Sequence, residues 1–170
     1  LQKGNLKIGS TLKGIGPAYT DKASRNGLRV GEILRKDFIQ IYQEHTAVHL
    51  SILKNYSFDF DLKEYESGWF EGIELLKKFR IENTEYLINN LATSGKKVLA
   101  EGAQGTMLDL DFGSYPYVTS SNTISAGACT GLGISPRTTG EVFGIFKAYC
   151  TRVGSGPFPT ELNDETGELL

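Results

Sequence analysis

A short apolar run that passes directly into a long polar loop is the feature that most constrains the fold of this chain. The run KKVLAE, residues 96–101, predicts a short buried strand. The loop that follows, EGAQGTMLDLDFGSYPYVTSSNT at residues 101–123, is rich in glycine, hydroxyl and carboxylate side chains. Ligands of open α/β sheets bind outside the carboxyl ends of the strands. The pattern therefore predicts a loop that holds a small polar ligand.

A second segment repeats this arrangement nearer the end of the chain. EVFGIFKAYCTRVG, residues 141–154, is apolar and aromatic with partial alternation, so its second half predicts another strand. Gly154 and Gly156 then predict a turn within residues 151–161. From residue 97 onward the chain carries 11 of its 20 glycines. Both polar loops therefore stand where a ligand site is expected.

The middle of the chain, about residues 35–94, has the periodicity of helices. Apolar residues recur at three- and four-residue spacing in residues 36–56 and less cleanly over residues 69–91, after which Gly95 predicts a helix end. His45 and His49 stand four residues apart, a spacing that metal ligands use. No third histidine is present in the chain, so we predict packing or capping roles for both.

The entry segment is punctuated by glycine. The glycines and the proline of GIGP, residues 14–17, argue against a long helix there. The stretch YTDKASRNG, residues 19–27, predicts one or two helical turns, with Thr20 as the N-cap and Gly27 as the stop.

Composition excludes several classes of protein. The 170 residues are 39% hydrophobic and 22% charged, which is typical of a soluble globular domain with a core. A net charge of −2 without a basic cluster argues against a nucleic-acid partner, and short apolar runs predict no membrane span. Cys129 and Cys150 stand in unrelated contexts, which favours buried thiols in a reducing compartment. Since Leu1 rather than Met comes first, we expect a piece of a longer protein, with unpaired sheet edges and exposed apolar surface.

The polar loop offers several candidate ligand contacts. Gln104 can donate and accept a hydrogen bond at once, which suits the edge of a base or an amide, and Gly105 allows close approach of backbone. Asp109 and Asp111 would point the same way on extended backbone and could bind a hard cation. The alternative, which we favour, is that they cap a helix or bind amides of the loop.

Anion binding is the second chemistry that the residues suggest. The run VTSSNT, residues 118–123, can cradle a phosphate with hydroxyl and backbone N–H groups, or it can be a helix N-cap followed by a turn; the spacing does not decide. The entry segment adds Thr11, Lys13, Lys22 and Arg25. Arg25 is suited to bidentate phosphate binding, although an exposed arginine without a role is an equal alternative. The residues indicate a site for an anionic small molecule and no particular reaction.

Three stretches together resemble the adenylosuccinate synthetase family. They are KGIGPAYTDKASRNGLRVG, the loop of residues 101–123 and KAYCTRVGSGPFPTEL, in that order, and the likeness runs from about Gly9 to the end of the chain. It is weakest in the helical middle. The resemblance implies an α/β fold, here a fragment of a P-loop-NTPase-like synthetase domain with a helical middle segment and strands leading into nucleotide-binding loops. We expect one incomplete domain with segments 1–30, 31–95 and 96–170.

The resemblance also implies a reaction. The family joins IMP and L-aspartate with hydrolysis of GTP to GDP and phosphate, using Mg²⁺, in the biosynthesis of AMP. The reaction is thought to pass through 6-phosphoryl-IMP, which aspartate attacks. A cytoplasmic homodimer is expected for the parent enzyme.

The family's IMP contacts carry over to positions of this sequence. Thr11 and Thr119 match contacts of the 5′-phosphate, and Arg25 matches an arginine that reaches the IMP of the partner subunit. Gln104 matches the purine contact near the 6-oxygen. The remaining matches are Leu108, which packs by the nucleotide, Val153, whose backbone approaches the ribose, and Lys22, a signature lysine that we expect to have a supporting role in the active site.

Departures from the family pattern concern the entry segment. Leu12 stands where the family often has glycine, and it would be strained if that position needs positive φ. Arg25-Asn26 replaces a pair of arginines. The family's catalytic Asp and His, its GTP and Mg²⁺ sites and its aspartate-binding loop have no counterpart in this sequence, so we expect the isolated chain to be inactive. The rival hypothesis is a non-enzymatic α/β nucleotide-binding or dimerisation module.

Overall fold

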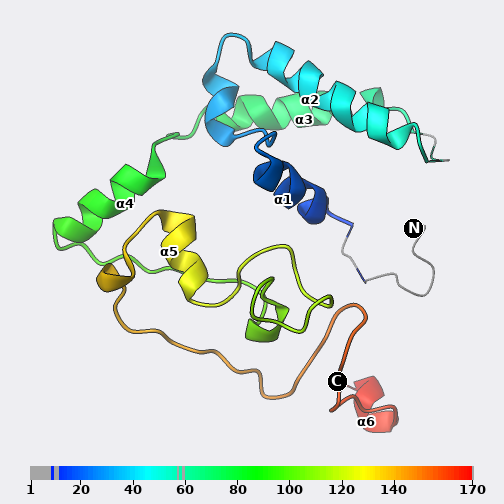
Figure 1. Ribbon diagram of the computed structural model, residues 1–170, viewed down its shortest axis with the longest axis vertical. Helices are drawn as coiled ribbons and strands as arrows, with labels where there is room; N and C mark the ends of the chain where they lie inside the picture. Colours follow the sequence, from blue (N-terminus) through cyan, green and yellow to red (C-terminus); the bar gives the residue numbers. More distant parts are fainter. Residues whose placement is uncertain (1–8, 10–11, 57, 59, 170) are drawn as a thin grey trace. The chain divides into compact units, whose positions relative to one another are not determined.

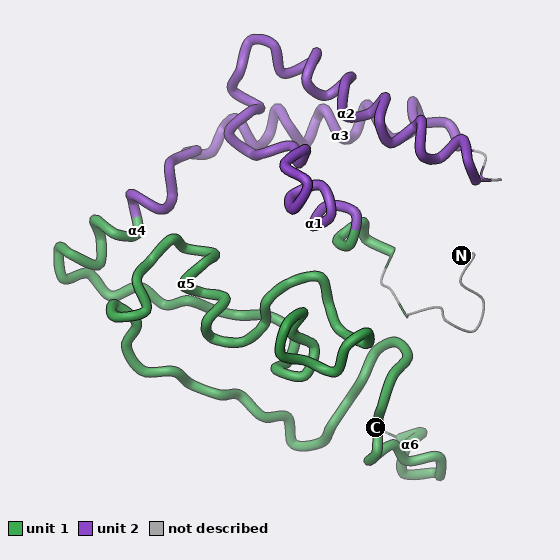
Figure 2. The backbone as a smooth tube through the Cα atoms, viewed as in Figure 1, with its two compact units in different colours: residues 1–16, 88–170 green, residues 17–87 purple. Residues whose placement is uncertain are grey.

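The computed structural model describes residues 9, 12–56, 58 and 60–169, and the elements of these residues are helical (Figure 1). Contacts divide the chain into two units, residues 1–16 with 88–170 and residues 17–87 (Figure 2). The elements, in chain order, are α1 (Ile15–Ser24), η2 (Val30–Leu34), α2 (Phe38–Leu53), α3 (Lys63–Leu76), α4 (Thr84–Thr93), η3 (Thr106–Leu108), α5 (Ala126–Leu132), η4 (Pro136–Thr138) and α6 (Glu165–Leu169).

The unit of residues 17–87 contains the apolar core. Ile33 of η2, Phe38 of α2 and Ile73 of α3 are 4%, 4% and 7% exposed, and Phe70 and Ile81 pack against them. Aromatic rings extend this cluster. Tyr42 stacks on Trp69 with centroids 4.8 Å apart, and its hydroxyl donates a hydrogen bond to Glu66 Oε1 at 2.9 Å. These contacts fix α2 and α3 against each other.

The weaker periodicity over residues 69–91 proves to be two helices rather than one. The chain leaves the helical path after Leu76 and resumes it at Thr84. In the connection between the two helices, Ile81 packs on the core, whereas Phe79 stays 65% exposed. The buried residues of this connection therefore do not lie on one face of a helix. The predicted end at Gly95 is confirmed. Gly95 has φ 76°, and the Lys96 N–H donates to the Leu91 carbonyl at 3.0 Å, which closes the turn after α4.

The start of α1 was predicted wrongly. The helix begins at Ile15 and includes Gly16 and Pro17, so Thr20 lies inside it rather than at its N-cap. Backbone N–H groups in the first turn have no partner within a helix, and proline is therefore tolerated there. The helix ends at Ser24, which places its last turn before the predicted stop at Gly27.

The strands predicted in residues 96–101 and 141–154 are absent from the part of the chain that the structure describes. Both segments are irregular, and no backbone hydrogen bond between described residues involves residues 97–104 or 140–150. A strand is stable only when a neighbouring strand pairs with its N–H and C=O groups. The apolar side chains of these segments face solvent, with Leu99 87%, Ile145 96% and Phe146 94% exposed. The expected exposed apolar surface is thus observed.

Helices α1 to α6, as far as they consist of described residues, are too short or too polar to cross a membrane.

Candidate functional site

A buried carboxylate organises the polar loop of residues 101–123. Asp109 has no exposed surface. Its Oδ1 accepts hydrogen bonds from the N–H groups of Asp111 and Phe112, both at 2.9 Å, and its Oδ2 accepts those of Thr123 at 2.6 Å and Ile124 at 3.2 Å. These backbone donors, first among them that of Phe112, lower the pKa of Asp109 from 3.8 to about 2. One side chain therefore joins the two ends of the loop.

The favoured role of the two aspartates, binding of loop amides, is confirmed. Asp111 takes part through Oδ2, which accepts a hydrogen bond from Asn122 Nδ2 at 2.6 Å. The alternative that residues 118–123 form a helix N-cap is wrong, because the N-cap of α5 is Ser125. Described His, Cys, Asp and Glu side chains form no cluster of three that could hold a metal ion.

Two of the predicted IMP contacts come together within this loop. The Thr119 N–H donates to the carbonyl of Leu108 at 2.8 Å, and Leu110 N–H donates to the Ser121 carbonyl at 3.2 Å. Gly113 allows the backbone to pack closely against residues 107 and 109, since a side chain there would collide with the carbonyls of Met107 and Asp109. Thr119 and Leu108 are half-buried and are held by backbone bonds rather than by their own side chains.

Gln104, which lies earlier in the same loop, has a strained backbone conformation. Its φ is 61°, in the left-handed region that non-glycine residues rarely adopt, and its side chain is exposed. Thr123 Oγ1 donates to the carbonyl of the next residue, Gly105, at 2.7 Å. The backbone after Gln104 is therefore tied to the hydroxyl-rich end of the loop.

The turn that carries Val153 is tied to the same loop by Arg152. Its guanidinium Nη2 donates to the carbonyls of Tyr117 at 3.1 Å and Ser155 at 2.9 Å. Val153 itself is 87% exposed, which leaves its backbone accessible. The role of Arg152 was missed from the sequence, where only its position in a glycine-rich turn could have indicated it.

The other predicted residues belong to the entry segment, of which Lys22 and Arg25 lie in the unit of residues 17–87. Lys22, on α1, lies over the ring of Tyr19, with Nζ 5.4 Å from the centroid. Thr11 lies outside the described residues. Leu12 has φ 54°, so the strain expected for a non-glycine residue at this position is observed.

Arg25 occupies the left-handed position that ends α1. Its φ is 65°, its N–H donates to the Lys22 carbonyl at 3.2 Å, and the Asn26 N–H donates to the Asp21 carbonyl at 2.9 Å. This is the hydrogen-bond pattern of a Schellman motif, in which glycine is usual. The corresponding left-handed positions after α4 and α5 are Gly95 and Gly133. Arginine at such a position carries backbone strain that glycine would avoid.

Replacing Arg25 by glycine is expected to raise the free energy of unfolding by about 1 kcal/mol, because a left-handed backbone no longer strains a Cβ. The matched control is the reverse change, Gly95→Ala, where φ is 76° and no atom lies within 4 Å of the added Cβ. It should cost a similar amount. Urea unfolding followed by circular dichroism measures both, and a destabilising Arg25→Gly would contradict the strain argument.

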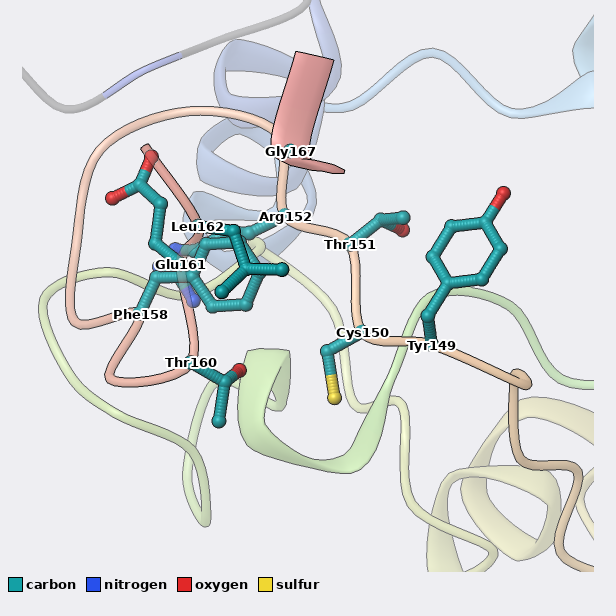
Figure 3. A pocket seen from close by; sticks show the side chains of 9 residues that line it. All are labelled: Tyr149, Cys150, Thr151, Arg152, Phe158, Thr160, Glu161, Leu162 and Gly167. Carbon is teal, nitrogen blue, oxygen red and sulfur yellow. The ribbon is translucent and has the colours of Figure 1, made fainter. Parts of the chain in front are cut away.

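A hollow of about 320 Å³ lies beside the Val153 turn (Figure 3). The side chains of Phe158, Leu162 and Arg152 gather on one side of it, and the ring of Tyr149 lies apart from them. None of the predicted IMP contacts among the described residues lines this hollow. Its lining residues are Tyr149, Cys150, Thr151, Arg152, Phe158, Thr160, Glu161, Leu162 and Gly167.

Comparisons with known proteins agree on one family. The family model for adenylosuccinate synthetase matches residues 1–170. Adenylosuccinate synthetases of Bacteroides fragilis and Bacteroides thetaiotaomicron are 63% and 64% identical over 168 residues, covering 99% of this chain and 40% of theirs. A structure described as fully ligated adenylosuccinate synthetase from Plasmodium falciparum is 42% identical, with a TM-score of 0.84 over 98% of this chain and 39% of that one. The chain thus spans about 40% of the length of these curated relatives.

Proposed function

Because the chain belongs to the adenylosuccinate synthetase family, we propose that it forms the IMP side of that enzyme's active site. In the complete enzyme, IMP and L-aspartate would be joined to adenylosuccinate while GTP is hydrolysed to GDP and phosphate. Gln104 would bind the purine near its 6-oxygen, and Thr119 and Thr11 would bind the 5′-phosphate. Leu108 would pack beside the nucleotide, and the backbone of Val153 would approach the ribose.

The non-glycine residues with left-handed backbone give the strongest support to this proposal. The non-glycine residues with positive φ in the described chain are Leu12, Arg25 and Gln104, with φ values of 54°, 65° and 61°. Gln104 is the proposed purine contact, Arg25 is proposed to reach the IMP of a partner subunit, and Leu12 adjoins the proposed contact Thr11. Strained backbone of this kind persists where a side chain is needed in one place, as at ligand sites. The coincidence supports a role for these residues that folding alone does not require.

The fixed conformation of the loop also supports the proposal. Asp109 fixes the backbone from residue 109 to residue 124, so that the hydroxyls of residues 118–123 sit on a preorganised frame. A preorganised anion site loses less conformational entropy when its ligand binds. Neutral hydroxyl and N–H donors suit a 5′-phosphate that enters with IMP and must leave again as part of adenylosuccinate.

The remaining parts of the reaction are proposed for the rest of the family chain. We place the Mg²⁺ and GTP sites, the catalytic acid–base groups and the aspartate-binding loop there, as the family resemblance implies. Arg25 would reach the IMP of a partner subunit in a cytoplasmic homodimer, and Lys22 would support the active site from α1. The isolated chain is accordingly expected to be inactive.

The test uses an exchange chimera, in which this chain replaces the matching segment of the Bacteroides fragilis synthetase. In the chimera, Thr119→Val and Gln104→Ala are expected to raise KM for IMP about tenfold or more, because each removes a hydrogen bond to the nucleotide. KM for GTP should stay unchanged. Thr119→Ser, which keeps the hydroxyl, and Gln40→Ala, an exposed glutamine of α2 bonded to Glu44, are the matched controls.

Equal KM values for IMP in Thr119→Val, Thr119→Ser and the parent chimera would show that the Thr119 hydroxyl does not bind IMP. The rival hypothesis, a nucleotide-binding or dimerisation module without catalysis, predicts that the chimera binds IMP or dimerises and makes no adenylosuccinate.

A further inference from the structure

A histidine and a carboxylate that are far apart in the sequence meet between α1 and α2. His49 Nε2–H donates a hydrogen bond to Asp21 Oδ2 at 2.8 Å, across 28 residues of sequence and within the unit of residues 17–87. The side chains are 43% and 27% exposed, so the pair lies at the edge of the solvent rather than in the core. The sequence indicated no carboxylate partner for this histidine, because the fold brings the two together.

The histidine lies on α2, a helix that contributes to the apolar core. Phe38, Tyr42 and His49 follow one another at spacings of four and seven residues, which places them on one face of α2. The first two residues are fixed by the core and by the stacking on Trp69. His49 is therefore presented from a support that does not depend on α1.

The carboxylate belongs to the residue that closes the last turn of α1. The Asp21 carbonyl accepts hydrogen bonds from the Asn26 N–H at 2.9 Å and from Ser24 Oγ at 3.1 Å. The first of these bonds holds Arg25 in its left-handed conformation. Helix α1 has no buried residue among those described, so packing contributes little to its position. Asp21 thus connects α2, through its side chain, to the backbone turn of Arg25, through its carbonyl.

We propose that His49 is a positioning residue for Arg25, acting through Asp21. The imidazole holds the carboxylate, the carboxylate fixes the last turn of α1, and the turn directs the guanidinium toward the phosphate of the nucleotide. The identity of the Arg25 ligand rests on the function proposed above, whereas the coupling of His49 to the last turn of α1 is independent of that function.

The first test measures the coupling in the chain itself, without a ligand. In His49→Ala, amide hydrogen exchange at Arg25 and Asn26 is expected to accelerate about fivefold, as for loss of a partly exposed hydrogen bond. His49→Gln should restore protection, since the glutamine Nε2 can replace the imidazole donor. His45→Ala, one turn earlier on α2, should leave both amides unchanged. Unchanged exchange in His49→Ala, or equal acceleration in His45→Ala, would overturn the proposal.

The second test measures the consequence in the exchange chimera. His49→Ala is expected to raise KM for IMP about fivefold with little change in kcat, and His49→Gln to restore it. In an Arg25→Ala background the histidine substitution should have no further effect on KM. Additive effects of the two substitutions would overturn the positioning role. A parent chimera that does not use IMP would instead refute the proposed function, while the exchange measurement still decides the coupling.

Discussion

Replacing Asp109 by asparagine is expected to unlock the loop from residue 109 to residue 124. The carboxylate uses both oxygens as acceptors for backbone N–H groups, and asparagine would turn an NH₂ group toward donors on one side. Buried donors without partners are costly, because water cannot replace the lost acceptor. Amide exchange across residues 111–124 should therefore accelerate on the order of tenfold or more.

The same carboxylate predicts how the loop responds to acid. The folded-state pKa of Asp109, about 2, lies below the ordinary value of 3.8. Its contribution to stability is therefore fully present above about pH 4 and is lost as the pH falls from about 4 to about 2. In Asp109→Asn this contribution is missing at every pH, so the difference in stability from the parent should shrink across that range.

Asp111→Asn is the matched control for this measurement. Asp111 is exposed and its Oδ2 accepts one hydrogen bond, from Asn122, so its substitution should change exchange little. The comparison is made by hydrogen exchange and urea unfolding of the parent and both variants from pH 5 to pH 2. An Asp111→Asn effect as large as that of Asp109→Asn would contradict the central role of Asp109.

Phe38→Ala is expected to lower the free energy of unfolding of the unit of residues 17–87 by about 3–5 kcal/mol, by lost burial and the cavity left behind. Phe38 is 4% exposed and its ring centroid lies 6.0 Å from that of Trp69. The core of this unit is small, so few neighbours can close the cavity.

The single tryptophan of the chain, Trp69, reports this unfolding by fluorescence. Phe79→Ala is the matched control, because the same atoms are removed from a side chain that is 65% exposed. It should change stability by less than about 0.5 kcal/mol. Similar losses in the two variants would mean that Phe38 is not a core residue of the folded unit.

Local patterns in the sequence predicted local structure well. The three- and four-residue spacing of residues 36–56 predicted α2, and Gly95 predicted the end of α4, because helix periodicity and a left-handed glycine are short-range properties. The preference for amide binding by Asp109 was also confirmed. The start of α1 was missed because proline in a first turn carries no penalty.

Features that depend on partners distant in the sequence were not predictable. The strands of residues 96–101 and 141–154 required pairing that apolar alternation alone does not supply. The pair of His49 and Asp21 depends on how α1 meets α2, which no motif encodes. The left-handed conformation of Arg25 contradicts the local preference for glycine, and such departures are expected where a side chain serves a ligand.

The most direct test of the central claim is adenylosuccinate formation by the exchange chimera from IMP, aspartate and GTP with Mg²⁺. If this chain forms the IMP side of the site, turnover should lie within about tenfold of the Bacteroides fragilis parent, and the isolated chain should give none. A folded chimera that hydrolyses or binds GTP normally and forms no adenylosuccinate would contradict the account.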